Sequence, residues 1–191
     1  MQYYHKMEIT QLSVIQDELY SYVKDIVESP PKNFFNGKVV PYNELDKFPN
    51  LMQYLSSISK LPIHKSSPIK FFMSWPGAKS SIHMDYDTTS RIGLNIPVAG
   101  CDNTFLRYYE TSIDNVTIEN PRSALSQGYS YITKNPDLLQ LTDEIEFIKP
   151  YLVRTDHFHQ SINSSTEVRV IATMRWEANR HLTEFEDFVY I

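Results

Sequence analysis

The chain has 191 residues, of which 41% are hydrophobic and 13% aromatic, and its net charge is -5. This is enough apolar material for the core of one domain, so the composition argues against a disordered chain. The excess of acidic residues argues against a nucleic-acid partner, because nucleic-acid-binding proteins carry a basic surface. A local basic groove would still be compatible with the net negative charge.

Cys101 is the only cysteine, which excludes an internal disulfide and a zinc site built from several cysteines. The first residues, Met1 to Lys6, lack the apolar stretch of a signal peptide. No apolar run approaches the length of a membrane span. We therefore expect a cytoplasmic protein without a membrane partner.

The first third of the chain has helical patterns. Apolar residues recur at helical spacing from Ile9 to Ile26, and Pro30-Pro31 ends that segment. A second helical pattern runs from Leu45 to Ile58 with Pro49 inside it, so we expect two short pieces or a kinked helix. Residues 1–62 are therefore predicted to form a helical layer.

From Ile63 onward, short segments rich in aromatic and β-branched residues alternate with turn residues. They predict strands at Ile69–Trp75, Ser80–Asp85, Arg91–Val98, Thr104–Glu110, Asn115–Glu119, Tyr129–Thr133, Glu144–Ile148, Tyr151–Thr155, Phe158–Ile162 and Val168–Trp176. Such a series predicts a jelly roll or sandwich over 63–177, followed by a C-terminal segment, 178–191, with a short helix from His181. The predicted fold class is mainly β with N-terminal helices, in a single domain spanning 1–191.

His83 and Asp85 form a His-x-Asp pair that is the first candidate for chemistry. On a strand, residues two apart point to the same face, so one imidazole and one carboxylate can reach one ion. Asp87 is a second possible partner of His83, less favoured by the spacing. The third ligand has to come from a distant strand, and His157 and His159 both qualify. Two imidazoles and a carboxylate suit Fe(II), Mn(II) and Zn(II) alike.

Arg169 lies ten residues beyond His159, in the apolar run from Val168 to Trp176. Arg169 and Arg175 fall on the same face of the strand that this run predicts. That face is either a surface with exposed arginines or the lining of a pocket that holds an anion. A buried guanidinium is costly unless it is paired, and it binds carboxylates in a bidentate manner. The pocket interpretation suits a dicarboxylate co-substrate.

Taken in chain order, these residues resemble the signature of the Fe(II)/2-oxoglutarate-dependent oxygenases. Ile82-His83-Met84-Asp85 followed by Leu94-Asn95-Ile96-Pro97-Val98 is similar to the pattern of small phage- and bacteria-type members. Pro150-Tyr151-Leu152-Val153-Arg154-Thr155, followed by His159-Gln160-Ser161-Ile162-Asn163 and Arg169, is similar to their proline-led strand, His-x-x-x-Asn and arginine. The resemblance covers about Ile69 to Trp176.

The resemblance implies a double-stranded β-helix, the cupin-like form of the jelly roll. It implies that His83, Asp85 and His159 bind Fe(II), because the His-x-x-x-Asn match selects the second of the two distal histidines. It further implies that 2-oxoglutarate chelates the iron, that O2 is the oxidant, and that Arg169 pairs with the distal carboxylate of 2-oxoglutarate. Asn95 could hydrogen-bond the co-substrate or a bound acid, or be satisfied within the core.

The expected substrate is a free amino acid or an amino-acid side chain in a peptide or protein, hydroxylated with succinate and CO2 as co-products. Aspartyl/asparaginyl hydroxylases, which the Leu-Asn-Ile-Pro region loosely resembles, typically lack the carboxylate ligand, and halogenases replace it with a small residue. Asp85 therefore favours hydroxylation. Arg175, Trp75 and Arg107 are candidates to meet the substrate, although Arg175 also suits a structural ion pair.

Other classes of function fit part of the pattern. A cupin-type metalloenzyme that uses no 2-oxoglutarate, or a metallohydrolase, would keep the metal ligands but leave Arg169 without a co-substrate. A non-catalytic jelly-roll binding module would tolerate His83→Ala. The ordered set of His83, Asp85, His159 and Arg169 favours the oxygenase.

Overall fold

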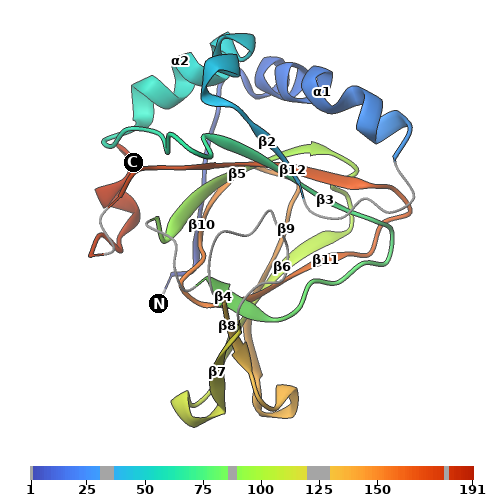
Figure 1. Ribbon diagram of the computed structural model, residues 1–191, viewed down its shortest axis with the longest axis vertical. Helices are drawn as coiled ribbons and strands as arrows, with labels where there is room; N and C mark the ends of the chain where they lie inside the picture. Colours follow the sequence, from blue (N-terminus) through green and yellow to red (C-terminus); the bar gives the residue numbers. More distant parts are fainter. Residues whose placement is uncertain (1, 31–36, 86–89, 120–129, 179–180) are drawn as a thin grey trace.

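The computed structural model describes residues 2–30, 37–85, 90–119, 130–178 and 181–191. Its strands form two six-stranded antiparallel sheets, and the two α-helices lie over the outer face of one of them (Figure 1). The predicted fold class, mainly β with N-terminal helices around a cupin-like jelly roll, is confirmed.

The helix-covered sheet has the strand order β1-β10-β5-β12-β3-β2. Its strands are β1 (Tyr4–Lys6), β10 (Tyr151–Arg154), β5 (Ile92–Ala99), β12 (Arg169–Arg175), β3 (Ile69–Ser74) and β2 (Lys38–Val40). The long strands β5, β12 and β3 lie at its centre, and the three-residue strands β1 and β2 form its edges.

The second sheet has the strand order β7-β8-β4-β11-β6-β9. Its strands are β7 (Val116–Glu119), β8 (Ser130–Thr133), β4 (His83–Asp85), β11 (Phe158–Asn163), β6 (Thr104–Glu110) and β9 (Gln140–Glu146). The pair β7 and β8 projects below the body of the molecule in Figure 1.

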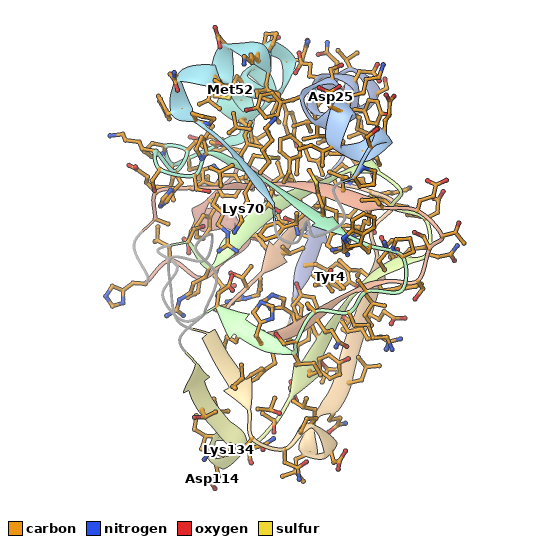
Figure 2. All side chains as sticks on the ribbon, turned by 45° about the vertical axis from the view of Figure 1, so that its right-hand side comes forward. Tyr4, Asp25, Met52, Lys70, Asp114 and Lys134 are labelled. Atoms are coloured by element: carbon orange, nitrogen blue, oxygen red, sulfur yellow. The ribbon has the colours of Figure 1, made fainter. Side chains whose placement is uncertain are left out.

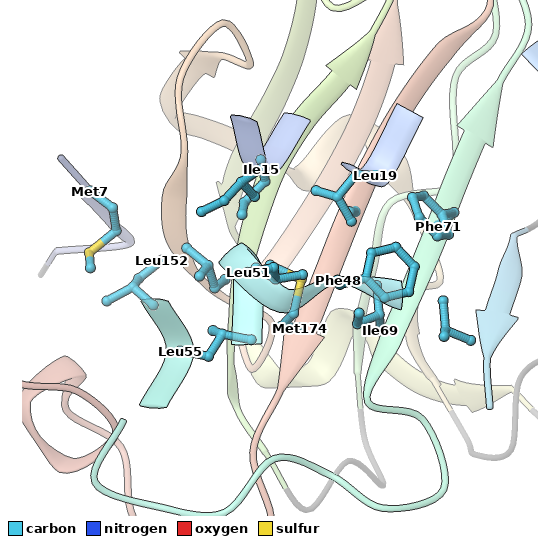
Figure 3. Close-up of a cluster of buried hydrophobic side chains, with 14 of the residues drawn as sticks. Met7, Ile15, Leu19, Phe48, Leu51, Leu55, Ile69, Phe71, Leu152 and Met174 are labelled. Atoms are coloured by element: carbon cyan, nitrogen blue, oxygen red, sulfur yellow. The ribbon is translucent and has the colours of Figure 1, made fainter. Parts of the chain in front are cut away.

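The helical layer consists of α1 (Leu12–Glu28), the 3-10 helix η1 (Tyr42–Lys47) and α2 (Pro49–Ile58). Pro49 occupies the first turn of α2, where a missing N–H costs nothing, so the second helical pattern is split into two pieces as predicted. Both α-helices bury an apolar face against the sheet (Figure 3). The shared core contains Ile15, Leu19, Phe48, Leu51, Leu55, Ile69, Phe71 and Met174.

The strand β12 separates two cores. Its residues Val170, Ala172 and Met174 pack beneath the helices, whereas Ile171 packs in a smaller cluster with Tyr108 of the opposite sheet. Because successive side chains alternate between faces, Arg169, Thr173 and Arg175 point toward the space between the sheets. The interpretation of this face as an exposed surface is therefore wrong.

All ten predicted strands are present, with shifted ends. The strand predicted at Glu144–Ile148 begins earlier, at Gln140, and the start predicted at Tyr129 lies outside the described residues. The short strands β1 and β2 were not predicted, because three residues carry too little pattern. Of the short helix predicted from His181, the described part of this segment forms one turn of 3-10 helix, η4 (Phe185–Asp187).

The described residues contain no helix that is both long and apolar enough to cross a membrane.

Candidate metal centre

Three side chains from two neighbouring strands of the second sheet converge between the sheets. His83 and Asp85 lie on β4, and His159 lies on β11, directly opposite His83 in the antiparallel register. One ligand atom from each of the three residues lies within 4.8 Å of the other two. The rings of His83 and His159 are 4.5 Å apart between centroids. The sheet thus brings together two imidazoles and a carboxylate, the set of the two-histidine, one-carboxylate triad.

Both imidazoles are held in the tautomer that a metal requires. Nδ1 of His83 lies 2.9 Å from the carbonyl oxygen of Ser81, and Nδ1 of His159 lies 2.8 Å from that of His157. A carbonyl can only accept, so each Nδ1 carries a proton and Nε2 is the nitrogen left to bind a metal. Nε2 of His83 lies 3.8 Å from Oδ1 of Asp85. This donor set fits a divalent metal ion.

Arg175 holds the carboxylate of Asp85. Its Nη2 donates to Oδ2 of Asp85 at 2.8 Å, and its Nη1 donates to the carbonyl of Ser90 at 3.0 Å and to Thr155 Oγ1 at 3.3 Å. Burial alone would raise the pKa of Asp85, but the positive charge of Arg175 lowers it to about 2. Asp85 is therefore an anion, with Oδ1 directed toward His83.

His159 is neutral at physiological pH. Burial and, after it, the nearby His83 lower the pKa of its imidazole to about 4, because Asp85 offsets them only in part. The ring is also 6.4 Å from that of the buried Tyr108, which pairs with it on β6. A neutral, fixed imidazole is the form that binds metal.

His157 lies apart from the three ligands. Its Nδ1 is 3.1 Å from Oδ1 of Asp156, and its ring meets the edge of Tyr3 at 5.3 Å. The structure therefore groups His159, and not His157, with His83. Asp87, the second possible partner of His83, lies outside the described residues.

Arg169 begins β12 with its guanidinium buried and unpaired. Its exposed fraction is 4%, and its Nε and Nη1 have no hydrogen-bond partner among the residues the structure describes. Burial lowers its pKa to about 10, so it is still a cation at neutral pH. Ser74, its cross-strand partner on β3, also has a buried hydroxyl without a partner in the described chain. Three unsatisfied polar atoms thus lie on adjacent strands.

Asn95 is engaged within the fold. The hydroxyl of Thr173, its cross-strand neighbour, donates to Asn95 Oδ1 at 2.7 Å. This contact places Asn95 beside the inward face of β12, but it uses the oxygen that would accept from a protonated ligand. Its role toward a co-substrate stays a prediction.

The predicted substrate residues lie in three different places. Arg107 alternates with the buried Leu106 and Tyr108 and so points to the outer face of β6, where it forms an ion pair with Glu144. This placement contradicts its predicted contact with substrate. Trp75 follows β3 and opens the turn closed by Ala78. Arg175 makes the structural ion pair that was its other interpretation.

Sequence reasoning missed two inward-facing residues of β3, Lys70 and Ser74. The alternate residues Ile69, Phe71 and Met73 belong to the core beneath the helices, so Lys70, Phe72 and Ser74 face the other sheet. The available signal was a lysine and a serine alternating with apolar residues in the strand predicted at Ile69–Trp75.

No protein-family model matches the sequence, and no curated protein matches it. The fold is similar to that of the non-heme alpha-ketoglutarate-dependent carbocyclase SnoK from nogalamycin biosynthesis, with a TM-score of 0.50 at 10% identity. That comparison covers 98% of this chain and 91% of SnoK. L-ribose isomerase of Cellulomonas parahominis matches at a TM-score of 0.38 and 10% identity, over 95% of this chain and 89% of that one. At such identities the likeness concerns the fold alone.

Proposed function

We propose that the protein is an Fe(II)- and 2-oxoglutarate-dependent oxygenase that hydroxylates an amino acid or an amino-acid side chain of a peptide or protein. His83, Asp85 and His159 would hold the iron. Bound Fe(II), with 2-oxoglutarate and O2, supplies the oxidising power and leaves succinate and CO2 as co-products. The likeness of the fold to SnoK agrees with the proposal without deciding the activity.

The observation that carries the proposal is the unpaired guanidinium of Arg169. A buried cation without a partner costs several kcal/mol, so a fold that keeps one is built to receive an anion. The buried guanidinium of Arg169, whose Nε and Nη1 have no partner in the described chain, and the hydroxyl of Ser74 on the adjacent strand are donors from which a carboxylate could accept.

The position of Arg169 relative to the triad suits a dicarboxylate. Asn163 Nδ2 donates to the Ser74 carbonyl at 2.9 Å, so the end of β11 lies beside Ser74 and its partner Arg169. Asn163 is four residues from His159 on the same strand, or about 13 Å along it. The arginine side chain and an extended five-carbon diacid together can bridge such a span, with one carboxylate at Arg169 and the other end at the metal.

The remaining contacts assign supporting roles within the chain. Ser81 and His157 hold the two imidazoles through their carbonyl groups, and Arg175 keeps Asp85 ionised and oriented. The two sheets and the buried Tyr108 keep water from the ring of His159.

The test is an anaerobic titration of the purified protein with Fe(II) and then 2-oxoglutarate, followed through the weak visible charge-transfer band of the chelate. The unmodified protein should develop the band. His159→Ala should abolish it, and Arg169→Met should require at least tenfold more 2-oxoglutarate. Arg107→Met is the matched control, because it removes an arginine from the outer face and should leave the titration unchanged.

A protein that binds iron but develops no band with 2-oxoglutarate would rule out the proposed co-substrate. The metal ligands would then be those of a cupin-type enzyme or a hydrolase. A band of equal strength in Arg169→Met would show that the guanidinium serves another anion.

A further inference from the structure

Lys70 is a second cation without a carboxylate partner on the inward face of the helix-covered sheet. It lies on β3 opposite Thr173 of β12, two residues along that strand from Arg175. In Figure 2 it lies between the helical layer at the top and the β7–β8 pair, marked by Asp114 and Lys134, at the bottom. No ion pair or hydrogen bond of its ammonium group is found within the described ranges.

Lys70 lies on the inward face of β3, beside the strand that carries Arg175, the partner of Asp85. Its Nζ lies 4.6 Å from the centre of the Phe72 ring, and its side chain is half-buried. Burial lowers the pKa of Lys70, the charge of Arg175 lowers it further, and the charge of Asp85 raises it. Lys70 therefore lies within electrostatic range of both members of the Asp85–Arg175 pair.

Within the described residues, the charges between the sheets do not balance. Of the three inward-facing cations on β3 and β12, only Arg175 has a carboxylate partner among the described residues. A divalent metal adds to the positive excess, and one 2-oxoglutarate, with two negative charges, leaves a further excess. The overall charge of the chain is -5, so this local positive region is opposite in sign to the chain as a whole and does not follow from its composition.

We infer that the substrate is acidic and that Lys70 binds its anionic group, a carboxylate or a phosphate, beside the metal centre. This inference rests on the proposed function and deepens it, because it names the substrate class. An ammonium group on a flexible stem binds one anionic oxygen as a point charge, and it suits a substrate that enters and leaves. The planar guanidinium of Arg169 then binds the co-substrate, 2-oxoglutarate.

The experiment uses the anaerobic complex of the protein with Fe(II) and 2-oxoglutarate. Entry of a substrate beside the metal perturbs the charge-transfer band, so binding is read without turnover. The probes are the twenty common L-amino acids, each as the N-acetyl acid and as the N-acetyl amide, together with O-phosphoserine. We expect at least one acid to perturb the band at a concentration tenfold or more below that of its amide.

The variants identify the residue that binds the acid. Lys70→Met should raise the concentration of that acid needed to perturb the band at least tenfold, and Lys70→Arg should restore part of the loss. Lys65→Met removes an exposed lysine just before the same strand, and it should respond like the unmodified protein. A response to O-phosphoserine alone would assign the site to phosphate.

Three outcomes would overturn the inference. The acids could be no better than their amides while O-phosphoserine also has no effect, which includes the case in which no probe perturbs the band. Lys70→Met could respond to the acids like the unmodified protein. Alternatively, Lys70→Met could weaken the binding of 2-oxoglutarate itself tenfold, which would show that Lys70 binds the co-substrate. Failure of the proposed function is a different result, because then no band forms before any probe is added.

Discussion

Arg175 donates a 2.8 Å hydrogen bond from Nη2 to Oδ2 of Asp85, whose other oxygen lies 3.8 Å from Nε2 of His83. The same guanidinium is fixed by the Ser90 carbonyl and by Thr155. One carboxylate oxygen of Asp85 thus accepts a hydrogen bond from Arg175, and the other faces the imidazole of His83. The geometry of the centre therefore depends on a residue that touches no metal.

We expect Arg175→Met to weaken metal binding by 10- to 100-fold, the usual effect of losing a partner of a metal ligand. Without the guanidinium, burial raises the pKa of Asp85, and the loss should be larger at pH 5.5 than at pH 7.5. Calorimetric titration with Mn(II) at both pH values measures it. Arg107→Met is the control, and equal affinities in the two variants would contradict this role.

The stability of the metal-free protein should fall as the pH drops from about 6.5 to about 4. The folded pKa of His159 is about 4, below its ordinary value of 6.5, so the unfolded chain binds more protons in this window and folding weakens as the pH falls. This pKa shift corresponds to a contribution to the free energy of unfolding on the order of 3 kcal/mol at most, and the contribution is fully present above pH 6.5. Urea unfolding with EDTA present, at pH 7 and pH 4.5, measures it.

His159→Gln should remove most of this pH dependence, because glutamine has no proton to gain. Asp85 does not contribute in the same window: its folded pKa is about 2, against an ordinary value of 3.8, so its contribution is lost only below pH 3.8. An unchanged difference between pH 7 and pH 4.5 in His159→Gln would show that another group is responsible.

Arg169→Met should leave the protein without co-substrate as stable as the original or more stable, by about 2 kcal/mol. An unpaired buried guanidinium costs free energy, and a methionine replaces the apolar stem of the arginine without that cost. With Mn(II) present, 2-oxoglutarate should raise the melting temperature of the unmodified protein but not that of the variant. A clearly less stable variant would show that Arg169 has a structural partner.

The strand pattern predicted the fold because a jelly roll consists of short strands whose alternation is visible in one sequence. The pair His83 and Asp85 could be found in the same way, since two ligands on one strand share a face. The partner of Asp85 could not, because Arg175 reaches it across the two sheets. Lys70 and Ser74 were missed for a related reason: which face of β3 is inward depends on where the helices pack.

Asn163 should prove essential to the position of Arg169. Its Nδ2 donates to the carbonyls of Ser74 and Glu167, and its Oδ1 accepts from the backbone and the hydroxyl of Ser165. Asn163→Ala removes all four of these hydrogen bonds from a buried side chain, so we expect a loss of about 2 to 4 kcal/mol. Chemical denaturation measures it.

Ser165→Ala is the matched variant for this turn, because it removes only hydroxyl contacts and should cost about 1 kcal/mol. If Asn163 positions the start of β12, Asn163→Ala should also weaken the binding of 2-oxoglutarate in the anaerobic titration, measured at temperatures where the variant is folded. Ser165→Ala should not. Equal stability losses in the two variants would contradict the assigned role, since Asn163 alone joins β3, β11 and the segment that leads into Arg169.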